Sequence, residues 1–347
     1  MEGPAPITMS PTSSSAHLPG PLHLPDLLYS DSERAFADSL RSLLADRGGV
    51  DHARVESVQT YDDGLWKAVA TDMGCAGLLI PEYHGGHNAS YREAASAAEA
   101  LGAFVAPVPF LGSAVVATTA LISADEGGVT GVADALPAGL LLVPADGVPQ
   151  GLYLVEMSAE GVSKAPVVSL DMTRQLCDLL FDDAPGTLIA SGTAASQAVQ
   201  AALTAGAAML AAEQVGLAQR CLDMTIAYVK ERRQFARPVG SFQAIKHRLA
   251  DLWVEITQAR AAARYAAACL AAGDPDAPVA VALAKAYCSE AAVHAAQECV
   301  QLHGGIGFTW EHPAHLYLKR AKADSVGFGT PDGHRAALAS LANLPPA

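Results

Sequence analysis

Apolar residues recur at three- and four-residue intervals over most of the chain, which is the spacing of amphipathic helices. In its first third this pattern predicts helices over Glu33–Leu44, over a segment that starts after Asp63, over Tyr91–Leu101 and over Gly112–Ile122. The apolar run Leu78-Leu79-Ile80 is closed by Pro81 and the pair Gly85-Gly86, which predicts a loop after a buried segment. This part of the chain is therefore expected to be helical.

The pattern changes between residues 124 and 190, where short β-leaning runs alternate with glycine, proline and aspartate. Four runs predict strands: Gly139–Val143, Leu152–Glu156, Val167–Ser169 and Leu176–Phe181. Such short strands with frequent turn residues indicate a small β domain.

Helical spacing returns after Ser191 and continues almost to the end. It predicts helices over Ala195–Lys230, from a cap at Gly240-Ser241 to a stop at Gly273, over Pro278–His303 and over His312–Lys322. Long helices with short connections form a bundle.

These patterns predict a mainly α fold with a small β domain, divided into four regions. They are a disordered tail over residues 1–28, an N-terminal helical domain over 29–123, a reduced middle β domain over 124–190 and a C-terminal helical bundle over 191–347. The tail carries six prolines, the run Ser13-Ser14-Ser15 and almost no charge, so it has little with which to form a core.

Composition narrows the classes of function. A net charge of −14 argues against binding to nucleic acid or to an anionic membrane. Six cysteines lie far apart without a C-x-x-C pair or a His/Cys cluster, so we expect neither a disulfide scaffold nor a metal site, and a cytoplasmic location. No basic residue precedes Arg34, which argues against a secretory signal. The alanine-rich stretch Ala198–Ala212 is expected to be a buried helix rather than a membrane span.

One segment concentrates positive charge in this acidic chain. Lys230–Arg248 holds six of the 22 basic residues: Lys230, Arg232, Arg233, Arg237, Lys246 and Arg248. Such a patch suits a compact polyanion such as a pyrophosphate, and Phe235 and Phe242 could stack on a ring beside Gln243. A solvated loop between two helices is the alternative, and composition does not choose between them.

A second segment, Gln301–Phe308, has glycine at positions 304, 305 and 307. Glycines at a helix end allow a ligand or another chain to approach the backbone closely. They are also common as simple helix caps.

Both segments resemble the acyl-CoA dehydrogenase family, over Tyr228–Asp251 and over Gly304–Ala321. Met73–Glu82 with its following glycine pair is similar to the first-domain motif of that family, and Leu170–Arg174 is similar to the end of its middle domain. The resemblance extends over about residues 30 to 345. It implies an N-terminal helical domain, a β domain and a C-terminal four-helix domain.

The resemblance also implies FAD as cofactor, shared across a subunit interface, and an acyl-CoA substrate that undergoes α,β-dehydrogenation. By motif position, Arg232, Phe235 and Gln243 would contact the pyrophosphate and adenosine region of FAD. Gln301, Gly304 and Gly305 would contact its ADP moiety. Ala236 stands where the family usually has glycine, which tightens that loop.

The catalytic half of the family pattern is missing. The family removes the α-proton with a glutamate, and the two positions where that glutamate occurs carry Phe328 and Gly206 here. A Thr-Glu-Pro-x-x-Gly-Ser-Asp-like segment, which binds the isoalloxazine ring in the family, does not occur between Ser123 and Ser191. We therefore expect no catalytic residue of the usual kind in this chain.

Three interpretations follow. In the first, the chain is the non-catalytic subunit of a heteromeric α2β2 acyl-CoA dehydrogenase, a type that the resemblance links to actinobacterial steroid degradation. In the second, it is a self-sufficient dehydrogenase with a displaced base, for which Asp324, Glu311 and Asp332 are the nearest carboxylates, each expected to be a solvated surface charge. In the third, it is a flavin-free scaffold that keeps only the fold.

Overall fold

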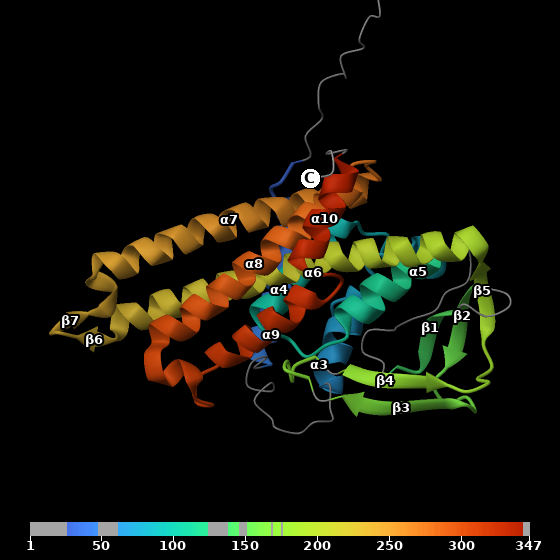
Figure 1. The fold of residues 1–347 in the computed structure, drawn as a ribbon, viewed down its shortest axis with the longest axis horizontal. Coiled ribbons are helices and arrows are strands. Elements are labelled where there is room, and N and C mark those ends of the chain that lie inside the picture. Colours follow the sequence, from blue (N-terminus) through green and yellow to red (C-terminus); the bar gives the residue numbers. More distant parts are fainter. Residues whose placement is uncertain are drawn as a thin grey trace, which may run out of the picture.

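In the computed structural model, helices of the two ends of the chain pack together and a small β region lies beside them (Figure 1). The structure describes residues 26–47, 62–123, 138–145, 151–167, 169–174 and 176–342. The α-helices are α1 (Asp31–Asp46), α3 (Asp63–Lys67), α4 (Tyr91–Ala103), α5 (Thr118–Ser123), α6 (Gly192–Glu231), α7 (Gln243–Ala272), α8 (Ala277–His303), α9 (Ala314–Val326) and α10 (Pro331–Leu341). The predicted fold class is confirmed.

Shorter helical segments extend or connect these helices. Two are π-helical, η1 (Ala68–Asp72) and η4 (Phe110–Ala117), and they continue into the helices that the sequence predicts around them. Four are 3₁₀ turns: η2 (Cys75–Gly77), η3 (Glu82–His84), η5 (Val239–Ser241) and η6 (Gly304–Phe308). The predicted cap at Ser241 is wrong, because η5 takes up Ser241 and α7 begins after Phe242 without a side-chain cap.

The β region consists of two separate antiparallel units. One sheet has the order β1-β2-β5, formed by β1 (Leu140–Ala145), β2 (Gly151–Glu156) and β5 (Thr187–Ser191). The other is the hairpin of β3 (Val162–Val167) and β4 (Leu176–Phe181). The predicted strand Val167–Ser169 is misplaced: the strand ends where it was expected to begin. Its residues are mostly exposed, so they show no apolar alternation to mark them.

Helix α6 is the centre of the molecule and packs against α4, α7 and α8. It is long and apolar enough to be a candidate membrane span, but 83% of its most apolar window is buried inside the protein. The helix is thus a core helix, as expected for Ala198–Ala212. Its small side chains let the neighbouring helices approach closely.

The close crossing of helices α4 and α6 requires glycine at one position of each helix. A Cβ on Gly102 would lie 2.0 Å from the carbonyl oxygen of Glu213, and a Cβ on Gly216 would lie 1.9 Å from the carbonyl oxygen of Glu99. Each helix therefore presses its backbone against a glycine of the other. This contact joins the N-terminal helices to the C-terminal bundle.

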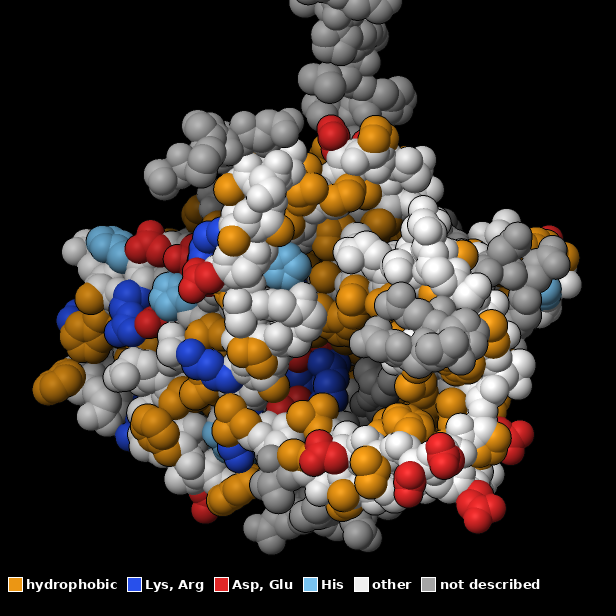
Figure 2. Space-filling view, turned by 45° about the vertical axis from the view of Figure 1, so that its right-hand side comes forward, with side chains coloured by type: hydrophobic (Ala, Val, Ile, Leu, Met, Phe, Trp, Pro, Cys, Tyr) orange, Lys and Arg blue, Asp and Glu red, His pale blue; other side chains and the backbone are white. Residues whose placement is uncertain are grey.

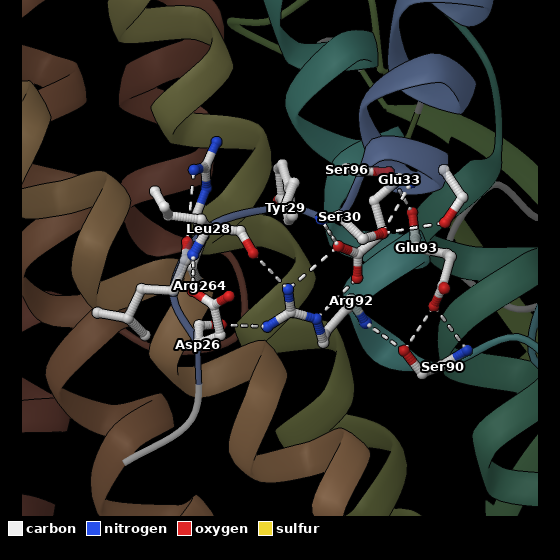
Figure 3. Close-up of polar contacts among 12 residues, drawn as sticks. Asp26, Leu28, Tyr29, Ser30, Glu33, Ser90, Arg92, Glu93, Ser96 and Arg264 are labelled. Atoms are coloured by element: carbon white, nitrogen blue, oxygen red, sulfur yellow. Dashed lines mark hydrogen bonds and ion pairs between the residues drawn. The ribbon is translucent and has the colours of Figure 1, made fainter.

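An extended N-terminal strap, which we define as Asp26–Ser30, crosses the same junction (Figure 3). Arg92 of α4 donates to the carbonyls of Asp26 and Leu28, and it forms an ion pair with Glu33 of α1 (2.7 Å). Of the predicted tail over 1–28, residues 1–25 lie outside the described residues. The part that is described is bound to the helices.

Tyr29 is the buried centre of the strap. Its hydroxyl donates to Glu99 of α4 (2.7 Å), and the guanidinium of Arg264 from α7 lies 3.9 Å from the centre of its ring. Arg264 also forms an ion pair with Glu99 (3.2 Å). Burial and the charge of Glu99 raise the pKa of Tyr29, so its hydroxyl remains a donor. One strap residue thus bridges both helical parts.

Candidate functional site

The two segments singled out in the sequence meet at one end of the helical bundle. The hairpin of β6 (Arg233–Gln234) and β7 (Arg237–Pro238) joins α6 to α7 there, and η6 follows the end of α8 (Figure 1). The ring of Tyr228, near the end of α6, stacks on His303, the last residue of α8, with ring centres 4.4 Å apart. The Nδ1 atom of His303 donates to the carbonyl of Cys299 (2.6 Å), which fixes the ring. Stacking therefore brings the basic loop and the glycine segment together.

A two-residue turn forms the tip of the hairpin. Phe235 and Ala236 both have positive φ, +49° and +61°, the conformation that two-residue hairpin turns require. Phe235 is 87% exposed, whereas the ring of Phe242 already carries the guanidinium of Arg237 at 3.9 Å. Of the two predicted stacking rings, Phe235 is the one left open.

Several cations of the segment Lys230–Arg248 form no ion pair in the part of the chain that is described. Lys230, Arg232, Arg233 and Lys246 are exposed, and no ion pair joins any of them to another described residue. Arg248 differs from them, because it forms a two-pronged contact with Glu298 (2.7 and 2.6 Å). Arg248 therefore does not belong with the other cations of this segment. Lys230, Arg232, Arg233 and Lys246 remain without an ion pair to a described residue.

The three glycines of the segment Gln301–Phe308 differ in what the structure requires of them. Gly304 combines φ of +63° with ψ of −140°, a conformation almost restricted to glycine, and a Cβ on Gly307 would lie 2.6 Å from the carbonyl oxygen of Val300. Gly305 has no left-handed φ, and a Cβ there would meet nothing within 4 Å in the part of the chain that is described. Nothing in the surrounding packing therefore requires Gly305, and its backbone is open to a ligand or another chain.

The six predicted FAD contacts fall into this one region and are all exposed: Arg232, Phe235, Gln243, Gln301, Gly304 and Gly305. Gln243 begins α7 and Gln301 lies in the last turn of α8. The guanidinium of Arg232, the accessible backbone at Gly305 and the exposed ring of Phe235 are groups that can bind the ADP and pyrophosphate part of FAD. Their role as FAD contacts stays a prediction.

The two positions expected for a base lie against each other elsewhere in the bundle. A Cβ on Gly206 of α6 would lie 2.5 Å from Cε1 and 2.8 Å from Cζ of the Phe328 ring, and 2.9 Å from Val116 of η4. No carboxylate occupies either position, and the ring of Phe328 covers Gly206. The sequence placed these residues in motifs more than 100 positions apart, but it gave no sign of this contact.

A buried ionic cluster lies beside this contact. Arg174, in the connection between β3 and β4, binds both carboxylate oxygens of Glu213 (2.9 Å each) and the Oδ1 atom of Asp324 (2.8 Å). Glu213 and Asp324 are almost fully buried, and 21% of the Arg174 side chain is exposed. The face in Figure 2 is hollowed near its middle, where basic and acidic side chains meet among apolar ones.

Arg320 of α9 extends the cluster into the interior. It forms ion pairs with Asp171 (2.6 Å) and Glu213 (2.6 Å), and it donates to the hydroxyl of Thr173 (2.6 and 3.0 Å). Asp171 and Thr173 come from the same connection as Arg174, so a loop between two strands is bonded to two helices of the bundle. This connection is the segment that resembles the end of the family's middle domain.

Lys285 of α8 is completely buried next to the cluster. Its Nζ atom donates to Ser289 (2.9 Å) and to the carbonyls of Asp324 (3.0 Å) and Gly329 (3.2 Å). Burial lowers the pKa of Lys285 to about 8. The amine thus bonds the end of α9 and the turn that carries Phe328 to α8.

The carboxylates considered as displaced bases differ in their surroundings. Glu311 and Asp332 are exposed, as expected. The expectation for Asp324 is wrong: it is 1% exposed, and burial raises its pKa to about 7 even though Arg174 opposes the rise. Its Oδ2 atom has no hydrogen-bond partner among the described residues.

The sequence analysis did not identify Lys285 and Glu213, although each is marked in the sequence as an isolated charge in an apolar stretch. Glu213 is the only charged residue between Gly192 and Arg220, and Lys285 is the only one between Ala277 and Glu290. A single charge in a long apolar helix must find a buried partner. That partner lies far away in the sequence, so the isolated charge alone does not identify it.

The chain matches known proteins over nearly its whole length. Residues 30–125 match the family model described as acyl-CoA dehydrogenase, N-terminal domain, and residues 177–341 match acyl-CoA dehydrogenase, C-terminal domain. The acyl-CoA dehydrogenase IpdE2 of Mycobacterium tuberculosis is 37% identical over 304 residues, which are 84% of this chain and 91% of that protein.

Among solved structures, the ChsE4-ChsE5 complex from Mycobacterium tuberculosis superposes with a TM-score of 0.81 at 25% identity, over 93% of this chain and 100% of that one. The Tcur3481-Tcur3483 steroid acyl-CoA dehydrogenase superposes with a TM-score of 0.74 at 26% identity, over 90% of this chain and 98% of that one. The two family models match both terminal domains, and the sequence and the fold match those of known members. This chain therefore belongs to the acyl-CoA dehydrogenase family, a family of flavin-dependent oxidoreductases.

Proposed function

We propose that the chain is the non-catalytic subunit of a heteromeric, FAD-dependent acyl-CoA dehydrogenase. It contributes the site for the ADP and pyrophosphate half of FAD, and a catalytic partner subunit contributes the flavin-ring site and the base. The assembly contains two copies of each subunit and two FAD. Bound FAD supplies the acceptor for the hydride that leaves the β-carbon of the acyl group.

The observation that carries the proposal is the exposed region at the bundle end. Arg232 forms no ion pair with any described residue, Phe235 is 87% exposed, and no described residue lies where a Cβ on Gly305 would be. Unneutralised cations beside open backbone favour a phosphate-containing ligand. Because these groups are exposed on the surface of the chain, a partner subunit can hold the remaining half of such a ligand.

The second support comes from the place where a base would be needed. Removal of an α-proton from a thioester requires a positioned base of suitable pKa. Phe328 cannot accept a proton, and its ring leaves no room for a side chain at position 206. The partner subunit would therefore hold the proton-accepting carboxylate.

Two solved relatives support a heteromeric assembly and a class of substrate. ChsE4-ChsE5 is a complex of two proteins, and Tcur3481-Tcur3483 is described as a steroid acyl-CoA dehydrogenase. By analogy we assign a bulky, steroid-derived acyl-CoA to the assembly that this chain forms.

The test is co-expression with a full-length acyl-CoA dehydrogenase subunit from the same organism, followed by mass measurement in solution. We expect a 2:2 assembly that contains two FAD and loses its activity when the partner's glutamate is replaced. A stable homo-oligomer with one FAD per chain that oxidises acyl-CoA alone would refute the proposal. A folded chain that binds no flavin with or without a partner would support the scaffold interpretation instead.

Arg232→Ala tests the binding region itself. Loss of a charge-assisted bond to the pyrophosphate costs about 1.5–3 kcal/mol, so FAD should bind the assembly roughly tenfold more weakly or worse. Arg248→Ala is the matched control, because Arg248 lies near Arg232 in sequence but is already occupied by Glu298. Equal FAD affinity for both variants would remove Arg232 from the site.

A self-sufficient enzyme remains the second candidate because of Asp324. Its raised pKa and its unbonded oxygen are features of a general base. Its near-complete burial and its bond to Arg174 favour a structural role. Acyl-CoA oxidation by the chain without a partner, abolished in Asp324→Asn, would establish the second candidate.

A further inference from the structure

In the connection between β3 and β4, the usual arrangement of polar and apolar side chains is reversed. Leu170 and Met172 are 59% and 42% exposed. Asp171 and Thr173, which alternate with them, are almost fully buried, because both bind Arg320 of α9 (2.6 Å each). The buried ionic cluster therefore holds two large apolar side chains at the surface of the molecule.

The apolar surface continues along one face of the β3–β4 hairpin. Side chains alternate between the two faces of a strand, and residues directly opposite in an antiparallel pair share a face. Leu176 and Leu180 of β4 are 50% and 65% exposed, and Val167 of β3 is paired with Leu176. The other face of β4 is less exposed. Because the connection leaves β3 at Val167 and returns at Leu176, its exposed side chains extend this face. We call the whole the β3–β4 surface, formed by Val167, Leu170, Met172, Leu176 and Leu180.

Acidic side chains surround the β3–β4 surface. Asp178 is exposed on the same face, between the two leucines of β4. Glu160, Asp182 and Asp183 are exposed at the opposite end of the hairpin from the connection. In Figure 2, acidic side chains lie among apolar ones at the lower right, in the part of the molecule where Figure 1 shows β3 and β4. The register places Lys164 of β3 on the other face. The described charges on this face of the hairpin are therefore negative.

We propose that the β3–β4 surface is a docking site for a protein segment that combines apolar side chains with lysine or arginine. Exposed apolar patches with a polar rim mark interaction sites, and charge complementarity selects the partner. The acidic rim disfavours an anionic membrane, and it disfavours the same face of a second copy, since the chain has a net charge of −14. The ionic cluster fixes the connection to α6 and α9, so this part of the surface is ordered before binding. The proposal does not rest on the proposed function.

The test uses the full chain and a short synthetic peptide of alternating leucine and lysine, labelled for fluorescence anisotropy. The chain should bind this peptide saturably. Peptides of alternating serine and lysine, or of leucine and glutamate, should bind about tenfold more weakly or worse, because each lacks one of the two kinds of contact. Leu176→Ser combined with Leu180→Ser should weaken binding of the leucine–lysine peptide about tenfold. Leu283→Ser is the matched control, because Leu283 of α8 is 48% exposed outside the hairpin.

Asp178→Lys tests the charge separately, and it serves if the double leucine variant fails to fold. It should weaken binding of the leucine–lysine peptide about fivefold, since it reverses the charge in the middle of the surface. Circular dichroism checks that each variant is folded.

Two kinds of result would overturn the proposal. The first is an absence of saturable binding, or equal affinity of the wild type, Leu283→Ser and the surface variants. The second is a different occupant, shown by binding of the wild type to phosphatidylglycerol vesicles, or by a dimer of the chain, that the surface variants lose. Binding of the peptide to the chain alone, but not to its assembly with a catalytic subunit, would support the proposal and identify that subunit as the occupant.

Discussion

Ala236 is in the left-handed region at the tip of the β6–β7 hairpin, where the family usually has glycine. The left-handed conformation costs a residue with a Cβ about 1–2 kcal/mol. Glycine removes that cost but adds about 0.5–1 kcal/mol of backbone entropy to the unfolded chain. Ala236→Gly should therefore stabilise the protein by roughly 0.5–1 kcal/mol, measured by urea unfolding. Destabilisation would show that the turn is not strained.

Asp324 makes stability depend on pH. Burial first, and the charge of Glu213 second, raise its pKa to about 7, above that of the unfolded chain. The stability it contributes is therefore complete below about pH 4 and is lost as the pH rises through about 7.

Asp324→Asn cannot ionise. The variant should gain stability relative to the wild type between about pH 4 and about pH 7, in urea unfolding at each pH, and the difference should stay level at higher pH. Asp332→Asn is the control, because it makes the same substitution at a carboxylate that is 96% exposed. A constant difference for Asp324→Asn would contradict the raised pKa.

For single residues, the sequence showed which residue stands at each motif position, but it did not show how buried that residue is. It located Phe328 and Gly206 by motif, and the residues that it assigned to FAD lie in one exposed region, where their role stays a prediction. It misjudged Asp324, because the burial of a carboxylate depends on Arg174, which lies 150 positions away along the chain. Local patterns do not contain such long-range pairs.

Helices α4 and α6 cross with their backbones in contact, so that a carbonyl of each helix lies against Gly102 or Gly216 of the other. Gly216→Ala would force the helices apart, and overpacking of this kind costs about 1–3 kcal/mol or more. Gly305→Ala is the control: it should change stability by less than about 0.5 kcal/mol, because a Cβ there meets nothing. Thermal unfolding of both variants tests the contrast, and equal losses would contradict it.

Long amphipathic helices were predictable from periodicity, and short or exposed elements were not. Helices α6, α7 and α8 begin and end within a few residues of the predicted bounds. Helix α10 was not predicted, because it is a short surface helix without a buried residue. Strand β3 is mostly exposed along its length, so its residues carry no pattern either.

The N-terminal strap connects the parts of the whole molecule. Arg264→Ala would leave the buried Glu99, among the described residues, with the Tyr29 hydroxyl as its one remaining hydrogen-bond partner, which we expect to cost about 3 kcal/mol. Tyr29→Phe removes one hydrogen bond and should cost about 1 kcal/mol. Chemical unfolding of the two variants should give that order. The reverse order would show that the hydroxyl, rather than the ion pair, holds the junction.

The contact between Phe328 and Gly206 also constrains how this chain could change by mutation. Restoring a glutamate at position 206 alone would drive its side chain into the ring, and restoring one at position 328 alone would place a carboxylate among apolar neighbours. Each single step towards an independent catalyst therefore lowers stability before it can add activity. If the chain depends on a catalytic partner, as proposed, that dependence becomes a one-way evolutionary step that no single substitution reverses.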